Sequence, residues 1–570
     1  MKRKLLDNYF YIYCILIIFL GIVFRIWTLA HNNFTGDELN TVKYLKNFYS
    51  PLPDFYNFYS FLLSQPRGPL QNIITFFTFI IIPIRNEFIV RLPFSIFSVL
   101  SIFLFYLQVK EIFSKKVAII ATAVFSMNGL MIIFGQVAQY QSVVIFCILL
   151  SIYLYHTGVK RMEYRFFIFS GVIFGIGLLA HLDILGSVFF FLGYFLFELK
   201  NKKFIKFKIF SNFLFFLSAT AVSSLFYVFY FFSHFDEKKQ DYLQNRVFGS
   251  GFMPQTPYMN LGKILTLYMP DFYWIILFCF CVLSLALLFS KYKSKDKNMN
   301  KLFILVLFLF TFAFMFSFFP IKPRLSSLLI YLSSFLLILF SFFSRIKSVI
   351  FALIFYFLFS FSIYFYFMKD PRTHVYICLL PAFILFSYGI YFFIEHKSKF
   401  IKATSQVFFI LYFTFLSLVG YLMFFDKNSE YPWNRKNLIG YNLRYIDRTS
   451  VDGKISGVFG FGGSRHWLEI RELLDSDCLR GSLGTNENKS VLLFYLDSPL
   501  TPLSTVSSPD NYIFIFSPNS WSNFSEKMLQ SEQEYMLLKS YYVGNKPVTK
   551  IYGKKYIYKN QDLKCFLSTK

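Results

Sequence analysis

The sequence is poor in charged residues. Asp, Glu, Lys and Arg make up only 15% of the 570 residues, whereas 56% are hydrophobic. A soluble domain carries about 25% charged residues. Apolar runs of roughly 17 to 24 residues recur between Tyr9 and Phe425, which is the length that crosses a hydrocarbon core about 30 Å thick. The composition therefore excludes an ordinary soluble domain and indicates an integral membrane protein whose main partner is the lipid bilayer.

Cysteines are also sparse. The seven cysteines are scattered, and none belongs to a CxxC pair at a metal-ligand spacing. The sequence therefore supports no bound metal and no other cofactor. Cys478 and Cys565 both fall in the C-terminal tail, where export would allow them to form a disulfide, and the sequence leaves this pairing open.

Acidic residues are few, which leaves a formal net charge of +26. Such an excess can mark a nucleic-acid-binding protein, but here the basic residues form short clusters between apolar runs, as the positive-inside rule describes. We therefore expect no nucleic-acid partner and a cytoplasmic N-terminus. The basic connections assigned to the cytoplasmic side are 1–8, 110–116, 159–165, 199–208, 291–301, 344–347 and 396–402.

The apolar runs predict an all-α polytopic fold of about thirteen transmembrane helices in a module spanning 1–425. The run at 70–84 is too short to span and is predicted to be an interfacial helix within a large outer loop, 31–92; a second outer loop covers 233–271. An odd number of helices places the tail, 426–570, outside the cytoplasm as a small α/β domain. In the tail we expect strands at 491–495 and 512–516 and a helix at 528–540. The thirteen predicted helices are 9–30, 93–109, 117–134, 143–158, 166–180, 184–198, 209–232, 272–290, 302–319, 325–343, 348–368, 375–395 and 403–424.

An adjacent pair of acids, Asp37 and Glu38, follows the first predicted helix. Polar groups at a membrane interface are costly, so their placement carries information. A carboxylate in this position suits a general base, with the second acid orienting a substrate or holding the loop. The pair is therefore the first candidate for a catalytic site.

Several motifs around this pair resemble those of the GT-C superfamily, in the branch of protein O-mannosyltransferases and the lipid A aminoarabinose transferase (families 39 and 83). They occur in the family's order and spacing over roughly 1–200. The matching segments are Arg25-Ile26-Trp27 with Asp37-Glu38, Gln65-Pro66-Arg67-Gly68-Pro69-Leu70, Asn86-Glu87 with Arg91-Leu92-Pro93, Gln136 to Tyr140, and His181-Leu182-Asp183.

This resemblance implies a GT-C fold and a glycosyltransferase that takes a sugar from a polyprenyl-phosphate donor. The acceptor would be a glycan, lipid or protein of the cell envelope, outside a bacterial inner membrane. Asp37 would act as the general base, with Glu38 beside it. Arg67, Lys322 and Arg324 would meet the donor phosphate, and the remaining candidates would bind the substrate: Gln136, Gln139, Tyr140 and His181.

The second-loop motif departs from the family, because Gln136 and Gln139 stand where the family usually carries arginine. A glutamine can bind a sugar hydroxyl but cannot neutralise a phosphate. No second acid stands in this loop, so a metal cage built from two carboxylates is not expected.

Three other functions compete with this interpretation. A lipid-glycan flippase or transporter would carry ionisable residues midway through several helices and internal repeats, neither of which the sequence offers. An O-antigen-type polymerase would place basic motifs in large loops in the middle of the chain. A GT-C relative without catalytic activity, acting as a scaffold, is compatible with the two glutamines.

Overall fold

A computed structural model gives the fold, and it confirms an integral, multi-pass membrane protein that is mostly helical. The residues that it describes are 2–27, 29–34, 38–47, 50–64, 68–200, 204–234, 269, 271–292, 297–316, 323–368, 372–425, 464–487, 489–496, 509–516, 534–543, 545–558 and 566.

The first half of the chain forms α1 and the helices that pack around it. They are α1 (Lys2–Ile26), η1 (Glu38–Thr41), α2 (Phe55–Ser64), α3 (Leu70–Ile81), α4 (Glu87–Ile112), α5 (Lys115–Met127), α6 (Gly129–Gln136), α7 (Tyr140–Arg161), α8 (Tyr164–Ala180), η2 (Leu182–Ser187), α9 (Val188–Lys200) and α10 (Ile205–His234).

The second half completes the bundle and ends in a small sheet. Its elements are α13 (Asp271–Lys291), α14 (Lys297–Phe316), α15 (Pro323–Phe343), α16 (Ser348–Ser362), η4 (Ile363–Phe367), η5 (Arg372–Val375), α17 (Tyr376–Ile394), α18 (Lys399–Phe424), α19 (Trp467–Asp475), β1 (Leu483–Thr485), α20 (Lys489–Leu496), β2 (Asn511–Ile515), β3 (Tyr535–Val543) and β4 (Lys546–Lys554).

The predicted membrane segments coincide with helices. Among the described residues, ten helices are long and apolar enough to cross a membrane, or eleven if α5 and α6 count as one bent span. The two remaining segments of the predicted thirteen are helical but shorter, at Tyr164–Ala180 and Asn300–Met315. The break between α5 and α6 is a bend of 62° at Asn128, whose side chain accepts a hydrogen bond from the Met131 N–H and so begins a new helix.

The segment predicted as interfacial is α3, whose twelve residues span about 18 Å and cannot cross the hydrocarbon core. Two side chains hold α3 against η1. The Asn72 amide donates to the carbonyl of Asn40 at 2.7 Å, and the Thr75 hydroxyl donates to the carbonyl of Thr41 at 2.5 Å. The first loop and α3 therefore form one packed layer.

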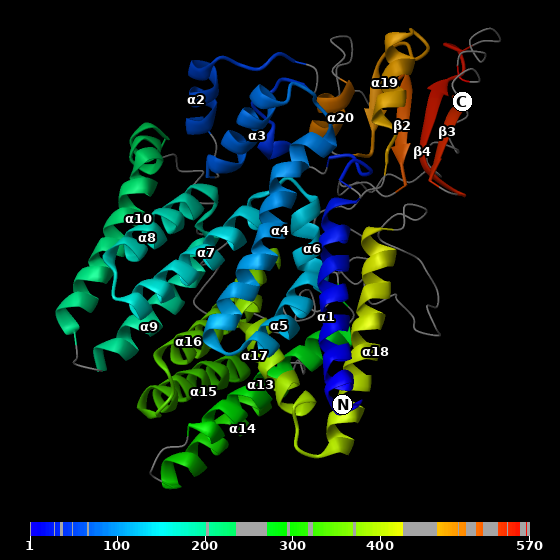
Figure 1. The fold of residues 1–570 in the computed structure, drawn as a ribbon. Helices are drawn as coiled ribbons and strands as arrows, with labels where there is room; N and C mark the ends of the chain where they lie inside the picture. The colour runs from blue at the N-terminus through cyan, green and yellow to red at the C-terminus, as the bar shows by residue number, and fades with distance from the viewer. Residues whose placement is uncertain are drawn as a thin grey trace.

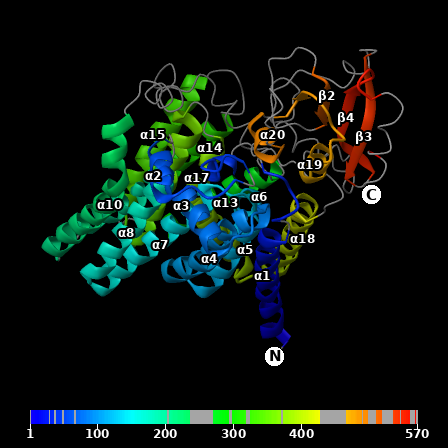
Figure 2. The same ribbon diagram turned by 90° about the horizontal axis from the view of Figure 1, so that it is seen from above.

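The ends of the bundle differ. Figure 1 shows α2, α3 and the tail elements α19, α20 and β2 to β4 gathered at one end, above α4, α6 and α1. We call this the loop end. Figure 1 also shows α18 beside α1, and Figure 2 shows α10 and α8 on the opposite side of the bundle from this pair. The loop end is where the predicted site residues would have to meet.

The tail carries a four-stranded sheet of order β1-β2-β4-β3. β1 pairs with β2 in parallel, with Leu483 opposite Asn511, and the other two pairs are antiparallel. All five residues of β2 are buried, as expected for an inner strand. The predicted α/β character of the tail is confirmed.

Two local predictions in the tail are wrong. Residues 491–495 belong to the helix α20, not to a strand, because a short apolar run suits a buried helix as well as a buried strand. The helix predicted at 528–540 is also wrong over its described residues, 534–540. A strand, β3, begins there at Tyr535 and pairs with β4. Cys478 is disulfide-bonded, and its expected partner Cys565 lies outside the described residues.

Candidate functional site

The first loop is held in place by one buried arginine in α4, Arg91, which uses all five of its N–H groups. Nε and Nη2 donate to the two carboxylate oxygens of Glu38 at 2.7 and 2.8 Å. The remaining N–H groups donate to backbone carbonyls of the loop, at Leu29, Asn32 and Asn33. Arg91 therefore fixes the path of the chain from the end of α1 to η1.

Glu38 joins this loop to the next one. Its side chain has no exposed surface, and besides Arg91 its carboxylate accepts the backbone N–H of Ala138 at 2.9 Å. The sequence leaves two roles open for Glu38, which are orienting a substrate and holding the loop, and these contacts favour the second. Asp37, the predicted general base, lies outside the described residues, directly before this anchored position.

The second loop places its two glutamines differently. The Gln136 amide nitrogen donates to the carbonyl of Phe24 in α1, so Gln136 fastens α6 to α1. Gln139 occupies the N-cap position of α7 but makes no side-chain capping bond, and its amide nitrogen is buried without a partner among the described residues. The same holds for Gln141 Oε1 and Ser142 Oγ in the first turn of α7.

These unpaired atoms mark the N-terminus of α7 as a place for a polar ligand. A buried polar atom without a hydrogen bond costs about 1–3 kcal/mol. Three such atoms fall within four residues, at a helix end whose first N–H groups also lack partners within the helix. A bound sugar or anion would supply the missing partners.

Tyr140, the first residue of α7, links this helix end to the end of α8. Its ring stacks on the imidazole of His181, with centroids 3.8 Å apart and planes 8° from parallel. His181 ends α8, and its Nδ1 accepts the backbone N–H of Asp183 at 3.1 Å. Two residues that the sequence predicts to bind substrate are therefore in contact.

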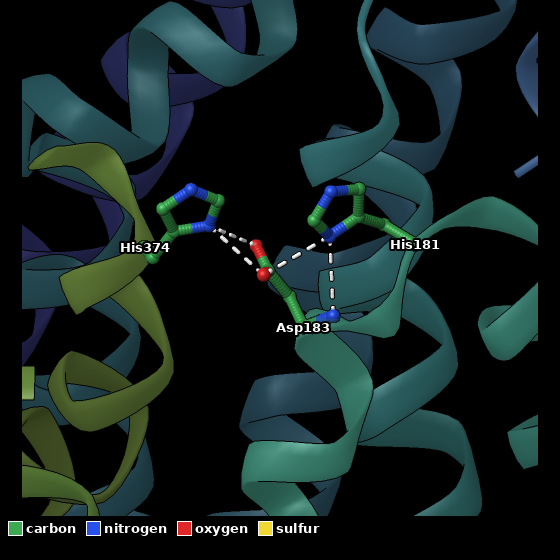
Figure 3. A group of neighbouring side chains, drawn as sticks. All are labelled: His181, Asp183 and His374. Carbon is green, nitrogen blue, oxygen red and sulfur yellow. Dashed lines mark hydrogen bonds and ion pairs between the residues drawn. The ribbon is translucent and has the colours of Figure 1, made fainter. Parts of the chain in front are cut away.

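A carboxylate lies between two imidazoles at this position (Figure 3). Asp183 in η2 faces His181 Nδ1 at 3.0 Å on one side and His374 Nδ1, from η5, at 2.7 Å on the other. The Tyr376 hydroxyl donates to the same carboxylate at 3.1 Å. All three residues of the cluster are at most half-exposed, and their potential ligand atoms lie within 4.8 Å of one another. Such a group can hold a proton or a cation.

The loop that carries Arg67 is packed against the same helix end. A Cβ on Gly68 would lie 2.2 Å from the carbonyl oxygen of Leu179 and 2.7 Å from that of Ala180, so a side chain at this position would clash. Glycine is what allows the loop to approach the last turn of α8 so closely. Arg67, directly before Gly68, lies outside the described residues.

The tail docks on the first loop through Tyr495 of α20. The Tyr495 hydroxyl donates to Glu87 Oε1 at 2.6 Å and accepts the backbone N–H of Phe34 at 2.9 Å. Burial and the neighbouring Glu87 carboxylate raise the pKa of Tyr495 well above its ordinary value, so this phenol stays a donor. The Arg465 N–H also donates to the Asn33 side chain at 2.5 Å. The tail and the first loop therefore lie on the same side of the membrane.

The described residues bring together part of the predicted site. Glu38 contacts the second loop, and Tyr140 contacts His181. Lys322 lies outside the described residues, and Arg324 lies in α15 without a described side chain. His374 is 191 residues from Asp183 in the chain and belongs to no motif in the sequence.

Part of the chain is similar to a known protein family. Residues 67–243 match the family model of the dolichyl-phosphate-mannose-protein mannosyltransferases. No curated protein matches the chain in sequence.

Several solved structures are similar at low identity. ArnT from Cupriavidus metallidurans in the apo state is 9% identical, with a TM-score of 0.44 over 94% of this chain and 97% of that one. The same protein bound to undecaprenyl phosphate is 10% identical, with a TM-score of 0.44 and the same coverage. The archaeal oligosaccharyltransferase AglB from Archaeoglobus fulgidus, in complex with an inhibitory peptide and a dolichol-phosphate, is 10% identical, with a TM-score of 0.43 over 87% of this chain and 64% of that one.

The segment that matches the mannosyltransferase family contains α3 to α10, and with them the Arg91 anchor, the N-terminus of α7 and the end of α8. It also contains most of the motifs on which the resemblance rests. Over this segment the chain is similar to the mannosyltransferase family, in agreement with the resemblance that those motifs predict.

Proposed function

We propose that the protein transfers a sugar from a polyprenyl-phosphate donor to an acceptor of the cell envelope, at the outer face of a bacterial inner membrane. The observation that carries this proposal is the group of unpaired polar atoms at the N-terminus of α7, on Gln139, Gln141 and Ser142, beside the His181 cluster. This group lies within the segment that matches a family described as using dolichyl-phosphate mannose to modify protein.

The proposed division of labour follows the placement of the residues. The α7 N-terminus, with Gln139, holds the sugar, because an amide donates to hydroxyls and carries no charge. Arg67, Lys322 and Arg324 are proposed to meet the phosphate of the donor, where a cation stabilises the charge that develops as the lipid phosphate leaves. The lipid chain lies in the bilayer, outside the polar site.

Asp37 is the proposed general base. It accepts the proton of the acceptor hydroxyl while the hydroxyl oxygen bonds to the anomeric carbon and the bond from that carbon to the phosphate oxygen breaks. The lipid phosphate departs with the bonding electrons, and the anomeric centre inverts. Glu38 supports this step indirectly, because its ion pair with Arg91 fixes the backbone next to Asp37.

The test is sugar transfer by purified full-length protein from a polyprenyl-phosphate sugar, comparing Asp37→Asn with wild type. Loss of a general base typically lowers the rate by about 10²- to 10⁴-fold. Asp54→Asn is the matched control. It makes the same change in the same loop, at an exposed residue that caps α2 by accepting the Asn57 N–H at 2.8 Å, and asparagine caps equally well.

Near-wild-type activity in Asp37→Asn, with folded protein, would remove this residue from the mechanism. If the wild-type protein binds the lipid but transfers no sugar from any polyprenyl-phosphate donor, the result would favour a scaffold.

A further inference from the structure

We propose that His181, Asp183 and His374 bind a divalent transition-metal ion, with zinc as the expected occupant. Two imidazole nitrogens and one carboxylate oxygen converge within 4.8 Å from three different elements, which are the end of α8, η2 and η5. This set matches the two-histidine, one-carboxylate sites that hold zinc with three protein ligands. Magnesium and calcium prefer all-oxygen sites, so they fit less well.

One contact of the cluster places a ring nitrogen close to a carboxylate oxygen. His181 Nδ1 lies 3.1 Å from the backbone N–H of Asp183 and 3.0 Å from Asp183 Oδ1. A lone pair on Nδ1 serves the N–H but repels the carboxylate, whereas a proton on Nδ1 serves the carboxylate but leaves the N–H unmatched. A metal ion bound by the imidazole and the carboxylate removes the repulsion between their lone pairs, and it takes the Nδ1 lone pair from the Asp183 N–H.

The separations within the cluster are shorter than those between the ligands of one zinc ion. His374 Nδ1 lies 2.7 Å from Asp183 Oδ2, and His181 Nδ1 lies 3.0 Å from Oδ1. Metal–ligand distances of about 2.0 to 2.2 Å in a tetrahedral zinc site place the ligand atoms about 3.3 to 3.6 Å apart. The three groups must therefore open by about half an ångström to hold the ion.

Neighbouring residues hold the ligands in position. Tyr376 donates to the Asp183 carboxylate at 3.1 Å, and the ring of Tyr140 stacks on His181. Hydrogen bonds and packing of this kind orient metal ligands and tune their affinity. Figure 3 shows that the second ring nitrogen of each histidine points away from the carboxylate, so Nδ1 is the nitrogen offered to the ion in both rings.

Three protein ligands leave a fourth position of the ion for water or for an anionic oxygen. Tyr140, the first residue of α7, stacks on His181, so the fourth position lies near the N-terminus of α7. A phosphate oxygen of the donor would therefore be a suitable fourth ligand. This last step alone rests on the proposed function, and the binding of the metal does not.

The test measures zinc rather than activity. Full-length protein is purified without a polyhistidine tag, stripped with a chelator, loaded with zinc chloride, and dialysed before elemental analysis. We expect about one zinc ion per wild-type chain and zinc binding at least about tenfold weaker in Asp183→Asn and His374→Ala. Asp183→Glu keeps a carboxylate and should retain zinc, which separates loss of a ligand from loss of the fold.

His396→Ala is the matched control. His396 makes the same local contact as His181, since its Nδ1 accepts the N–H of Ser398, two residues on, at 3.1 Å. Its removal should leave the zinc content unchanged. Full zinc content in Asp183→Asn and His374→Ala, or none in wild type, would overturn the site.

A second measurement needs no variant. Co²⁺ in place of zinc should give the visible absorption of a four-coordinate site with nitrogen and oxygen ligands. The spectrum of the hydrated ion alone would contradict the proposal.

Discussion

Replacing Glu38 with Gln should destabilise the whole loop end of the protein. The change keeps the size of the side chain and leaves one oxygen to accept a hydrogen bond, so it removes chiefly the negative charge. Arg91 then stays buried and charged opposite a neutral amide, since its side chain is only 2% exposed. Removing one partner of a buried ion pair costs about 3–5 kcal/mol, which corresponds to roughly 10²- to 10⁴-fold in the folding equilibrium.

Arg91→Lys should also destabilise the protein, although it keeps the charge. Arg91 serves five acceptors, and a lysine ammonium has three N–H groups. At least two buried acceptors are left without a donor, each at a cost of about 1–3 kcal/mol. The assay is unfolding of purified protein in mixed micelles by titration with a denaturing detergent, together with the abundance of each variant in the membrane.

Glu111→Gln is the control for this prediction. Glu111 pairs with Lys160 at 2.8 Å, but the two side chains are 34% and 66% exposed. An exposed pair contributes about 0–1 kcal/mol, so this change should leave the unfolding midpoint nearly unmoved. Equal midpoints for Glu38→Gln and Glu111→Gln would refute the assignment of Glu38 as the anchor of the loop.

Two further predictions concern the tail. Tyr495→Phe removes both the donor to Glu87 and the acceptor of the Phe34 N–H, so it should lower the free energy of unfolding by about 1–3 kcal/mol, measured in the same titration, and an unchanged value would contradict the docking contact. Single cysteines at exposed Leu493 and Phe204, in a background without native cysteines, should react with an impermeant thiol reagent from opposite sides of the membrane. Labelling of both from one side would contradict the predicted topology.

Much of the membrane fold is predictable from the sequence, because a bilayer imposes a length and an apolar composition on each span. The predicted segments therefore coincide with helices, and the segment predicted as interfacial is the twelve-residue helix α3. The secondary structure of the tail is harder to predict, because an aqueous domain sets no fixed length for its helices and strands. The run at 491–495 suits a strand and a helix equally well. It forms a helix, α20, that packs against the first outer loop through Tyr495.

The candidate site is predictable only where its residues are close in sequence. The contact between His181 and Asp183 follows from their spacing at the end of a helix. The contact between Asp183 and His374 does not, because it depends on how η5 and α17 pack against η2. For the same reason the sequence singles out Glu38 as an acid beside Asp37, but it cannot indicate that Arg91 buries it.

The most direct test of the account is the lipid content of a strain from which the gene is deleted. If the protein consumes a polyprenyl-phosphate sugar, that lipid should accumulate in the deletion strain. Expression of the wild-type protein or of Asp54→Asn should clear it, whereas Asp37→Asn should not. An unchanged content of polyprenyl-linked sugars in the deletion strain, with the corresponding envelope glycan, lipid or protein still modified, would contradict the proposed function.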